Sequence, residues 1–365
     1  MKVGLVIYGS LETISGGYLY DRKLVEYLLR QGDEVEIISQ PWGSYVERLG
    51  QNLEEKWRQR LAELDVDILL QDELNHPSLF EVNASVKPQI SYPILAITHH
   101  LRGSEKASKP LKWFYRQVEK HYLQGVDGFI WNSGTTRQVV EGVIGKGSAG
   151  VVAYPAGDRL GGLKDDQKPL RSQDTGPLRL LFIGSLIPRK GLHTLIAALA
   201  SLKSAAWALQ IVGRMDVDPA YTRRIRRMVD EQGLAGCIQF MGNLPEPDLV
   251  KEFQEAQVLV MASEYEGFGI VYLEGMSFGL PAIASTAGAA GEIIQDGVNG
   301  RLVAPGDAAA LAGAIRNYLE DRGLLQSHSR AARRRFLEFP TWEQSAATIR
   351  QFLLYFLESW KARKP

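Results

Sequence analysis

Residues 180–199 read LLFIGSLIPRKGLHTLIAAL, and this stretch combines a strand, a loop and a helix in that order. The apolar run ends at Ile183, Gly184 and Gly191 bracket the loop, and a helical apolar pattern follows. Similar β-rich runs alternate with helical patterns along the chain, at 3–8, 35–39, 67–70, 94–98, 128–131, 151–154, 208–212, 238–241, 258–262 and 282–285. Because strands that alternate with helices imply right-handed crossovers, the sequence predicts an α/β protein with parallel, doubly wound sheets.

The alternation is interrupted once, over residues 155–177, which are rich in Gly, Asp, Lys, Ser and Pro. This composition is typical of a linker. We therefore predict two Rossmann-like domains, residues 1–165 and residues 178–341, joined by a linker at 166–177. Since ligands bind at the carboxyl ends of the strands in such sheets, we expect two facing domains with a cleft between them and functional residues in the loops that follow strands.

The composition excludes several classes of protein. The chain has 365 residues, with 42 Lys plus Arg and 42 Asp plus Glu, so its formal net charge is zero and no nucleic-acid partner is expected. Its single cysteine, Cys237, can form neither an internal disulfide nor a cysteine metal site, and it suits a reducing compartment. The opening residues MKVGLVIYGS are too short an apolar run for a signal peptide, and no stretch approaches 20 apolar residues. We expect a cytoplasmic protein without a membrane span.

Two cations, Arg189 and Lys190, close the loop of residues 184–191 just before the predicted helix. Cationic side chains beside the free N–H groups of a helix N-terminus form an anion site, for which a diphosphate is a natural ligand. A solvated basic turn is the alternative interpretation of the same pair.

Residues 258–285, VLVMASEYEGFGIVYLEGMSFGLPAIAS, repeat the pattern of strand, loop and helix. Gly267 and Gly269 allow a tight turn with a close approach of the backbone. The N–H groups of Phe268, Gly269 and Ile270 open the following helix and favour a second anion.

Two carboxylates flank this turn, Glu266 in the loop and Glu274 in the helix, with seven residues between them. Either carboxylate can accept hydrogen bonds from hydroxyl groups, such as those of a ribose or another sugar. A favourable interaction with the helix dipole and an acid–base pair of a hydrolase are the alternative interpretations.

Two successive anion-binding loops in one domain indicate a single diphosphate ligand. The segments GSLIPRKGLHTLI (184–196), EGFGIVYLEGMSFGLPAIAS (266–285) and GEIIQDGVNGRLVAPGD (291–307) resemble the retaining glycosyltransferases of family 4, which have the GT-B fold. The resemblance covers residues 178–320 and is weaker in the N-terminal half. It implies transfer of a sugar from a nucleotide-diphosphate-sugar with retention of configuration, no bound metal, no cofactor, and a C-terminal helix at about 342–365 that crosses back to the first domain.

By this resemblance the donor binds mainly to the second domain. Arg189 and Lys190 would hold the diphosphate, Glu266 would bind the donor sugar, and Glu274 would bind the ribose. Gly242 and Leu244 would lie near the base. The full set of donor-binding residues would then be Gly16, Gly17, Gly184, Gly242, Leu244, Gly267, Phe268, Gly269, Ile270 and Glu274.

The resemblance also assigns residues of the first domain. Gly16 and Gly17 follow the first strand, where the family has a glycine-rich loop near the donor phosphate. His99 ends the strand PILAIT and aligns with a histidine near the reacting sugar, although His100 replaces the aspartate that usually follows it. Packing of two loop histidines is the alternative. His99, Arg189, Lys190 and Glu266 are thus the predicted catalytic residues, and Ser133 is predicted to cap a helix.

Residues 109–123, KPLKWFYRQVEKHYL, combine aromatic and basic side chains. Such a helix can dock on an anionic membrane surface, here the inner face, and many members of the family act on lipid-linked acceptors. We favour the interpretation that its aromatic side chains face the core. The expected partners are a nucleotide-sugar donor and a glycan, lipid-linked or small-molecule acceptor, in polysaccharide biosynthesis.

Three other functions share this architecture and stay open: a nucleotide-sugar epimerase, a phosphorylase, and a catalytically silent protein that binds a nucleotide sugar and regulates a partner. A dinucleotide-dependent oxidoreductase is less favoured, because no Gly-x-Gly-x-x-Gly motif follows the first strand of either domain.

Overall fold

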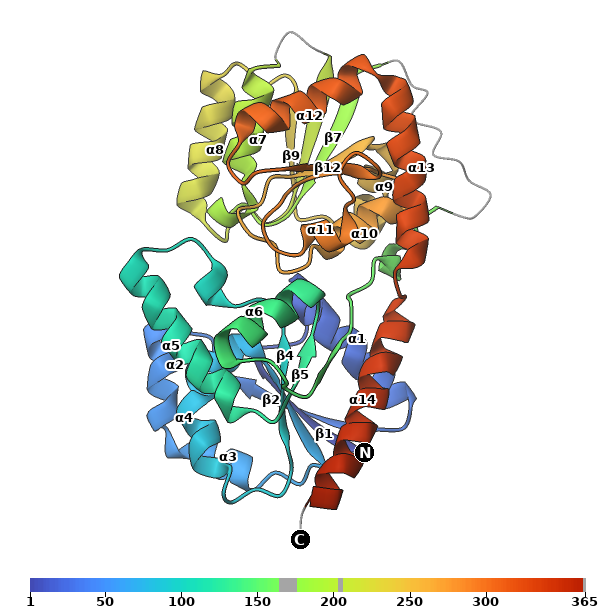
Figure 1. Ribbon diagram of the computed structural model, residues 1–365. Coiled ribbons are helices and arrows are strands. Elements are labelled where there is room, and N and C mark those ends of the chain that lie inside the picture. Colours follow the sequence, from blue (N-terminus) through green and yellow to red (C-terminus); the bar gives the residue numbers. More distant parts are fainter. Residues whose placement is uncertain (164–175, 203–205, 364–365) are drawn as a thin grey trace. The chain divides into compact units, whose positions relative to one another are not determined.

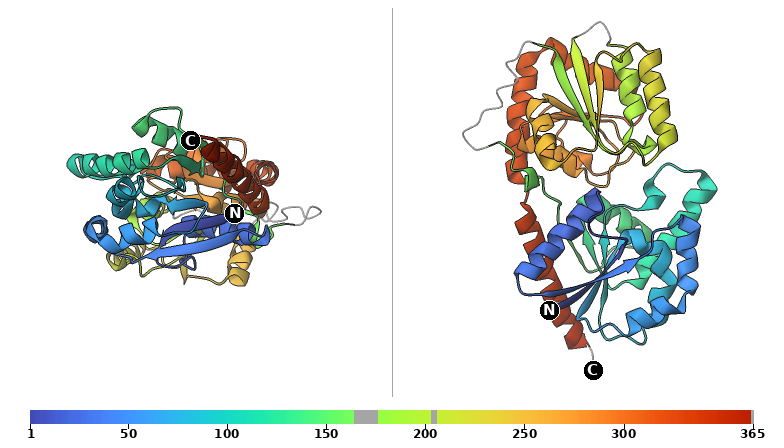
Figure 2. Two further views of the ribbon diagram at one scale, coloured as in Figure 1. Left: turned by 90° about the horizontal axis from the view of Figure 1, so that it is seen from below. Right: turned by 180° about the vertical axis from the view of Figure 1, so that it is seen from behind.

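The computed structural model describes residues 1–163, 176–202 and 206–363 (Figure 1). The chain divides into two compact units, which we call the first unit (Met1–Pro155 and Trp342–Pro365) and the second unit (Ala156–Thr341). Each unit contains one six-stranded sheet with helices on both faces (Figure 2). The predicted α/β class with two doubly wound sheets is therefore confirmed.

The sheet of the first unit has the order β2-β1-β3-β4-β5-β6, and every pair of strands is parallel. Its strands are β1 (Lys2–Tyr8), β2 (Glu34–Gln40), β3 (Ile68–Asp72), β4 (Ile94–Thr98), β5 (Gly128–Trp131) and β6 (Gly150–Val152). After β1 the chain adds β2 on one side of β1. It then crosses to the other side of β1, where it adds β3, β4, β5 and β6 in turn. The carboxyl ends of β1 and β3 therefore form a topological switch point, where ligands bind in sheets of this kind.

The sheet of the second unit has the order β12-β11-β10-β7-β8-β9 and is also parallel. Its strands are β7 (Leu178–Ile183), β8 (Trp207–Val212), β9 (Ile238–Gly242), β10 (Val258–Met261), β11 (Ala282–Ser285) and β12 (Gly300–Val303). The edge strand β12 is short and was not predicted. The switch point of this sheet lies between β7 and β10, so the two motifs singled out in the sequence follow adjacent strands.

Helices connect the strands, and several begin where the sequence offers a cap. The side chain of Ser133 accepts a hydrogen bond from the backbone N–H of Thr136 at 3.0 Å, which confirms its predicted capping role. The helices of the first unit are α1 (Gly16–Arg30), α2 (Tyr45–Gly50), α3 (Glu55–Ala62), α4 (His76–Val86), α5 (Lys109–Gly125), α6 (Gly134–Ile144) and α14 (Trp342–Arg363). Those of the second unit are α7 (Leu192–Ala200), α8 (Pro219–Glu231), α9 (Glu246–Glu255), α10 (Ile270–Ser277), α11 (Ala290–Ile293), α12 (Ala308–Glu320) and α13 (Arg322–Glu338).

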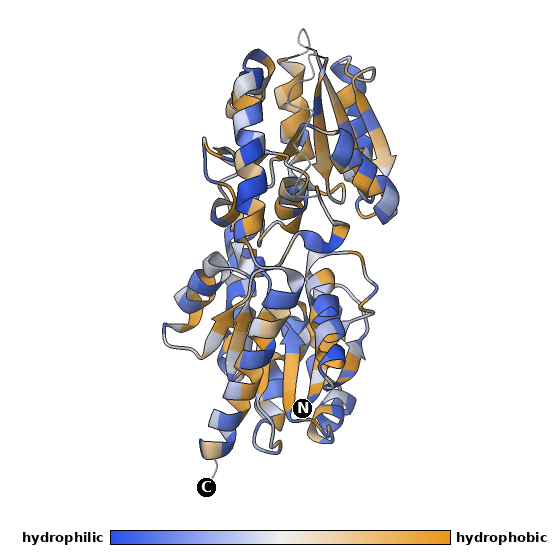
Figure 3. Ribbon diagram, turned by 90° about the vertical axis from the view of Figure 1, so that its right-hand side faces the viewer, coloured by the Kyte–Doolittle hydropathy of each residue, from blue (hydrophilic) through white to orange (hydrophobic). Residues whose placement is uncertain are grey.

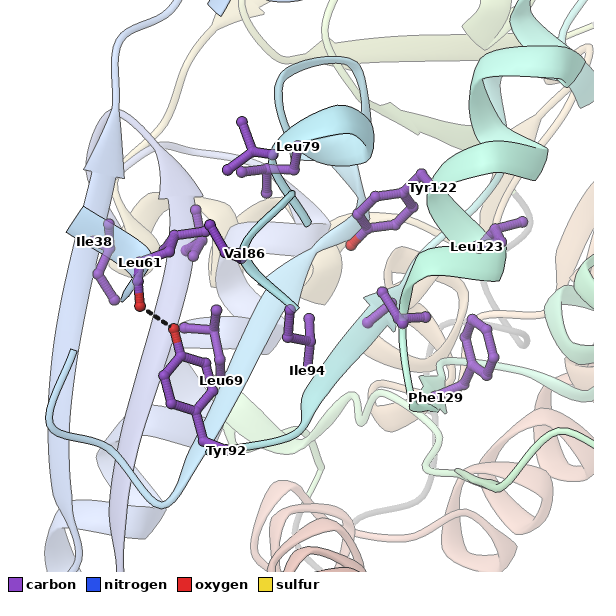
Figure 4. Close-up of a cluster of buried hydrophobic side chains, with 14 of the residues drawn as sticks. Ile38, Leu61, Leu69, Leu79, Val86, Tyr92, Ile94, Tyr122, Leu123 and Phe129 are labelled. Atoms are coloured by element: carbon purple, nitrogen blue, oxygen red, sulfur yellow. Dashed lines mark hydrogen bonds between the residues drawn. The ribbon is translucent and has the colours of Figure 1, made fainter. Parts of the chain in front are cut away.

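The strands are largely hydrophobic, while many of the helices carry both hydrophobic and hydrophilic residues (Figure 3). This pattern is expected when helices cover both faces of a parallel sheet. In the first unit, aliphatic side chains from β1, β3 and β4 pack against α4 and α5, and aromatic rings such as Tyr92 and Phe129 join them (Figure 4). The Tyr92 hydroxyl donates a hydrogen bond to the Leu61 carbonyl within this core, so the one polar atom of that ring is satisfied.

The C-terminal helix α14 packs on the first unit, as predicted. It lies beside α1, and the Arg350 guanidinium donates to the Asp33 carboxylate at 2.7 Å. Asp33 also accepts from the N-terminal amine at 2.9 Å. Burial acts to raise the pKa of Asp33, but these two cations outweigh it and the pKa lies below its usual value. The buried carboxylate thus joins both ends of the chain to one unit.

The boundary between the units falls at Pro155, ten residues earlier than the predicted limit at 165. Residues after Pro155 pack on α10 of the second unit, because Gly157 and Gly162 allow close backbone contact there. The Leu163 N–H donates to the Ser277 carbonyl at 2.9 Å. Residues 166–175 of the predicted linker at 166–177 lie outside the described residues.

Helix α5 only partly follows the interpretation favoured from its sequence. Tyr115 is buried, but Trp113 is 65% exposed and Phe114 is 38% exposed, so two of its three consecutive aromatic rings do not face the core. Helix geometry explains this, because consecutive residues of a helix point about 100° apart and three rings in a row cannot all face the core. Among the described residues, none of the helices combines the length and apolar character that crossing a membrane requires.

Candidate functional site

The two predicted anion-binding loops meet at the switch point of the second unit. The loop after β7 ends at Gly191, whose φ of +70° is in the left-handed region. A Cβ on Gly191 would lie 1.8 Å from the carbonyl oxygen of Ala262, just after β10. Only glycine therefore fits where the two loops touch. Both following helices, α7 and α10, begin at a glycine and have no side-chain cap, so their N-termini are suited to bind an anion.

Lys190 and Glu266 form the central contact between these loops. The Lys190 Nζ lies 2.7 Å from Glu266 Oε2, and both side chains are largely buried. The Ser263 hydroxyl donates to the same carboxylate oxygen at 3.1 Å. Burial acts to raise the pKa of Glu266, but Lys190 and Arg189 outweigh it, so the pKa lies below its usual value. Burial lowers the pKa of Lys190, against the opposing effect of Glu266.

Arg189 holds the same two loops together through the backbone. Its Nη1 donates to the Tyr265 carbonyl at 3.1 Å, and its own carbonyl accepts from the Glu264 N–H at 2.7 Å. The structure thus brings Arg189, Lys190 and Glu266 into one cluster.

The predicted glycines have distinct positions. Gly184 directly follows β7. Gly242 is the last residue of β9, and its carbonyl accepts a hydrogen bond from the N–H of Gly213, which follows β8. Gly269 adopts a φ of +94° at the start of α10, and a Cβ there would lie 2.3 Å from the ring of Tyr272. Of the remaining predicted donor residues, Phe268 is buried, Ile270 is the first residue of α10, and Gly267 and Leu244 are partly buried.

Glu274 has a partner that the sequence analysis did not identify. Arg159 Nε donates to Glu274 Oε1 at 2.5 Å, and Arg159 Nη1 donates to Glu246 Oε1 at 2.6 Å. Burial raises the pKa of Glu274, and the neighbouring Arg159 opposes this rise. Arg159 lies in the segment assigned from the sequence to the first domain, so only the observed boundary shows that it belongs to this site.

The predicted residues of the first unit meet at its own switch point. Gly16 and Gly17 form the first turn of α1 and not the preceding loop, since Ser15 caps the helix. A Cβ on Gly17 would lie 3.2 Å from the ring of His99, which follows β4. The N–H groups of His99 and His100 both donate to Glu73 Oε2, at 2.8 and 3.1 Å.

The two neighbouring histidines have different surroundings. His99 is buried, and its carbonyl accepts from Asn132 Nδ2 at 2.9 Å. The ring of Tyr20 packs edge-on against the His99 ring at 5.3 Å. The Nε2 of His100 instead lies 3.0 Å from Glu105. The buried ring distinguishes His99 from His100 as the residue suited to a site.

Two buried aspartates near His99 were missed in the sequence. Asp21 on α1 and Asp72 at the end of β3 are both fully buried. A signal was available, because Asp21 shares the core-facing stripe of α1 with Tyr18, Val25 and Leu28, where an apolar residue is expected. Asp72 gave no such signal, since its burial follows from the strand order.

Comparison with known proteins identifies related sequences. Residues 164–335 match the glycosyl transferases group 1 family. Glycogen synthase from Mycobacterium tuberculosis (strain H37Rv) is 30% identical over 288 residues, which are 76% of this chain and 66% of that relative. The chain therefore spans about two thirds of the length of this relative.

Solved structures identify the fold. Sucrose-phosphate synthase from Thermosynechococcus elongatus is similar with a TM-score of 0.83 at 23% identity, over 98% of this chain and 99% of that chain. The Anabaena protein HepE, in complex with UDP and glucose, has a TM-score of 0.76 at 20% identity, over 97% of this chain and 99% of that chain. The predicted GT-B fold is thus confirmed.

Proposed function

We propose that this protein is a retaining glycosyltransferase that moves a sugar from a nucleotide-diphosphate-sugar to a glycan, lipid-linked or small-molecule acceptor. The observation that carries the proposal is the contact of Lys190 with Glu266 between two uncapped helix starts at one switch point. The match to the group 1 family and the relative named glycogen synthase support the same activity. The UDP and glucose in the HepE structure support a nucleotide-sugar donor.

The charges of the site suit the departure of a nucleoside diphosphate. Cleavage of the bond between the sugar and the diphosphate places negative charge on the leaving oxygen and positive charge on the anomeric carbon. Arg189, Lys190 and the N-termini of α7 and α10 would stabilise the former in a largely buried setting. These cations carry the charge stabilisation in our proposal, so the transfer would need no metal and no cofactor.

The two glutamates would bind hydroxyl groups. Glu266, kept ionised by Lys190 and Arg189, would accept hydrogen bonds from the donor sugar. Glu274 would accept from the ribose in exchange for, or alongside, its bond to Arg159. We propose that His99 of the first unit acts near the reacting sugar.

The first unit would supply the acceptor side. On α5, the exposed rings of Trp113 and Phe114 stand beside Lys109 and Lys112. Exposed aromatic side chains next to lysines suit contact with an anionic membrane surface. This arrangement supports a peripheral membrane contact and a lipid-linked acceptor.

Thermal unfolding in the presence of UDP-, GDP- and ADP-sugars tests the donor site. A ligand at about 100 times its Kd stabilises the folded protein by roughly 2.7 kcal/mol. We expect one nucleotide class to raise the melting temperature of the wild type and of Lys251→Met, an exposed lysine on α9, but not that of Lys190→Met. The absence of stabilisation by every donor would contradict the proposal.

Product analysis then identifies the reaction. We expect release of nucleoside diphosphate that depends on an acceptor, and a new glycosidic bond with the anomeric configuration of the donor. Isomerisation of the donor sugar without an acceptor would indicate an epimerase. Donor binding without any turnover across glycan and lipid acceptors would indicate a silent regulatory protein.

A further inference from the structure

Three ionisable side chains meet at the switch point of the first unit. Asp21 comes from α1, Asp72 from the end of β3 and His99 from the end of β4. A carboxylate oxygen of Asp21, a carboxylate oxygen of Asp72 and a ring nitrogen of His99 all lie within 4.8 Å of one another. Asp21 Oδ1 is 3.6 Å from His99 Nε2. Three separate segments therefore converge where sheets of this kind bind ligands.

The polar atoms of this cluster have few partners. Both carboxylate oxygens of Asp21, Oδ2 of Asp72 and Nε2 of His99 are buried without a hydrogen-bond partner. Buried polar groups are otherwise almost always paired, because an unpaired group costs about 1–3 kcal/mol. Ionised carboxylates can only accept hydrogen bonds. These atoms can therefore be paired with one another only if a proton lies between members of the cluster.

Electrostatics limits how those protons are distributed. Two ionised carboxylates side by side in a buried site repel strongly, so such pairs share one proton. Burial raises the pKa of Asp21, and burial together with Asp21 raises the pKa of Asp72. Burial lowers the pKa of His99, while Asp72 opposes this.

In the described part of the chain, Arg48 acts on the neighbouring Tyr18, but no cation other than His99 is among the main electrostatic effects on the two aspartates. Tyr18 and Tyr20 on α1 and Glu73 after β3 surround it, and their own pKa values are raised chiefly by burial. Glu73 is already bonded to the N–H groups of His99 and His100. The remaining negative charge of the aspartate pair is therefore directed at the His99 ring.

The His99 ring is oriented by its contacts. Its Nε2 faces Asp21 and is buried, whereas Nδ1 is not among the buried unpartnered atoms. The side chain retains 11% of its exposure. Because Nε2 faces Asp21, Nδ1 is the ring nitrogen left for a ligand.

We propose that Asp21 and Asp72 are positioning residues that share one proton and hold His99 as the Nε2–H tautomer, so that Nδ1 is the basic atom presented to a ligand hydroxyl. When the hydroxyl loses its proton, the O–H bond breaks, an N–H bond forms at Nδ1, and the electron pair remains on the oxygen. The Asp21 carboxylate stabilises the resulting imidazolium. This role in proton transfer rests on the proposed function, whereas the tautomer does not.

Nitrogen-15 NMR of the histidine rings tests the tautomer in the full-length protein. The chain has six histidines, and His99→Asn identifies the signals of His99. We expect the Nε2–H tautomer for His99 in the wild type at pH 7.5. In Asp21→Asn the amide can donate to Nε2, so the Nδ1–H tautomer should gain population. Glu119→Gln, which changes another buried acid of the first unit that binds the Gly103 N–H, should leave His99 unchanged.

The outcomes separate the two proposals. A wild-type His99 in the Nδ1–H tautomer would overturn the inference without the need for any variant, as would an unchanged tautomer in Asp21→Asn. A shift of the His99 signals on addition of Mg²⁺, Mn²⁺ or Zn²⁺ to the wild type alone would also overturn it, because a cation would then occupy the cluster. The expected tautomer in a protein without transferase activity would contradict only the proposed function. In an active enzyme, we expect Asp21→Asn to lower kcat about 100-fold or more with little change in the KM of the donor.

Discussion

Arg159 Nε lies 2.5 Å from Glu274 Oε1, although 115 residues separate them along the chain. This contact joins the segment that follows the first unit to the helix proposed to bind the donor ribose. Arg159 also pairs with Glu246, so one guanidinium connects η4 (Asp158–Leu160), α9 and α10. The close packing of Gly157 against Leu273 places the segment so that Arg159 can reach both carboxylates.

Arg159→Ala is expected to destabilise the second unit. The substitution would leave the largely buried Glu274 without its cation. Removing one partner of a fully buried ion pair costs about 3 kcal/mol or more. The cost should be smaller here, because Arg159 is partly exposed. We expect a loss of about 2 kcal/mol in chemical denaturation. The double variant Arg159→Ala/Glu274→Gln should recover part of this loss. Equal stability of the double and single variants would show that the ion pair contributes nothing.

Lys190→Ala is expected to lower transfer about 100- to 1000-fold, because it removes the cation that we propose stabilises the leaving diphosphate. Turnover is measured as released nucleoside diphosphate with saturating donor. Lys251→Ala, at an exposed lysine paired with Asp248, is the control and should keep wild-type turnover. If the Lys190 variant were folded and fully active, the diphosphate site would have to lie elsewhere.

Gly191→Ala is expected to disrupt the contact between the loop after β7 and the loop after β10. The new Cβ would lie 1.8 Å from the Ala262 carbonyl oxygen, so the backbone would have to move, in addition to the strain of about 1–2 kcal/mol for a left-handed residue. Gly233→Ala has a similar φ of +67° and no atom within 4 Å of the new Cβ, so it shows the conformational strain alone. Thermal unfolding should show a clearly larger loss for Gly191→Ala. Equal losses would mean that the loops are not in close contact.

Stability should depend on pH through Asp21. Burial raises the pKa of this carboxyl to about 7, from about 4 in an unfolded chain. Between these values the folded state holds a proton that the unfolded state has released, so this group's contribution to the free energy of unfolding falls as pH rises, by at most ~1.4 kcal/mol per pH unit. Asp21→Asn removes this dependence, and its melting temperature relative to the wild type should rise from pH 5 to pH 8. Asp65→Asn, at an exposed carboxylate, should show a constant difference.

Local patterns in the sequence predicted much of the fold. Alternating β-rich runs and helical patterns located strands such as β4 and β5 at their observed limits, because burial on both faces of a parallel sheet requires continuous apolar runs. Glycines beside cations predicted the turn at Arg189 and Lys190, because all parts of that motif are adjacent in the chain. The exposed rings of α5 were not predicted, although the helical period of about 3.6 residues already implies that three consecutive rings cannot all face the core.

The sequence by itself determined the alternating α/β architecture and the cationic loop at residues 184–191, because both depend on neighbouring residues. Only the tertiary structure decided that Arg159 binds Glu274 and that Asp21, Asp72 and His99 share one buried site. The order of strands in a sheet brings together loops that are distant in the chain, and no local pattern encodes that order.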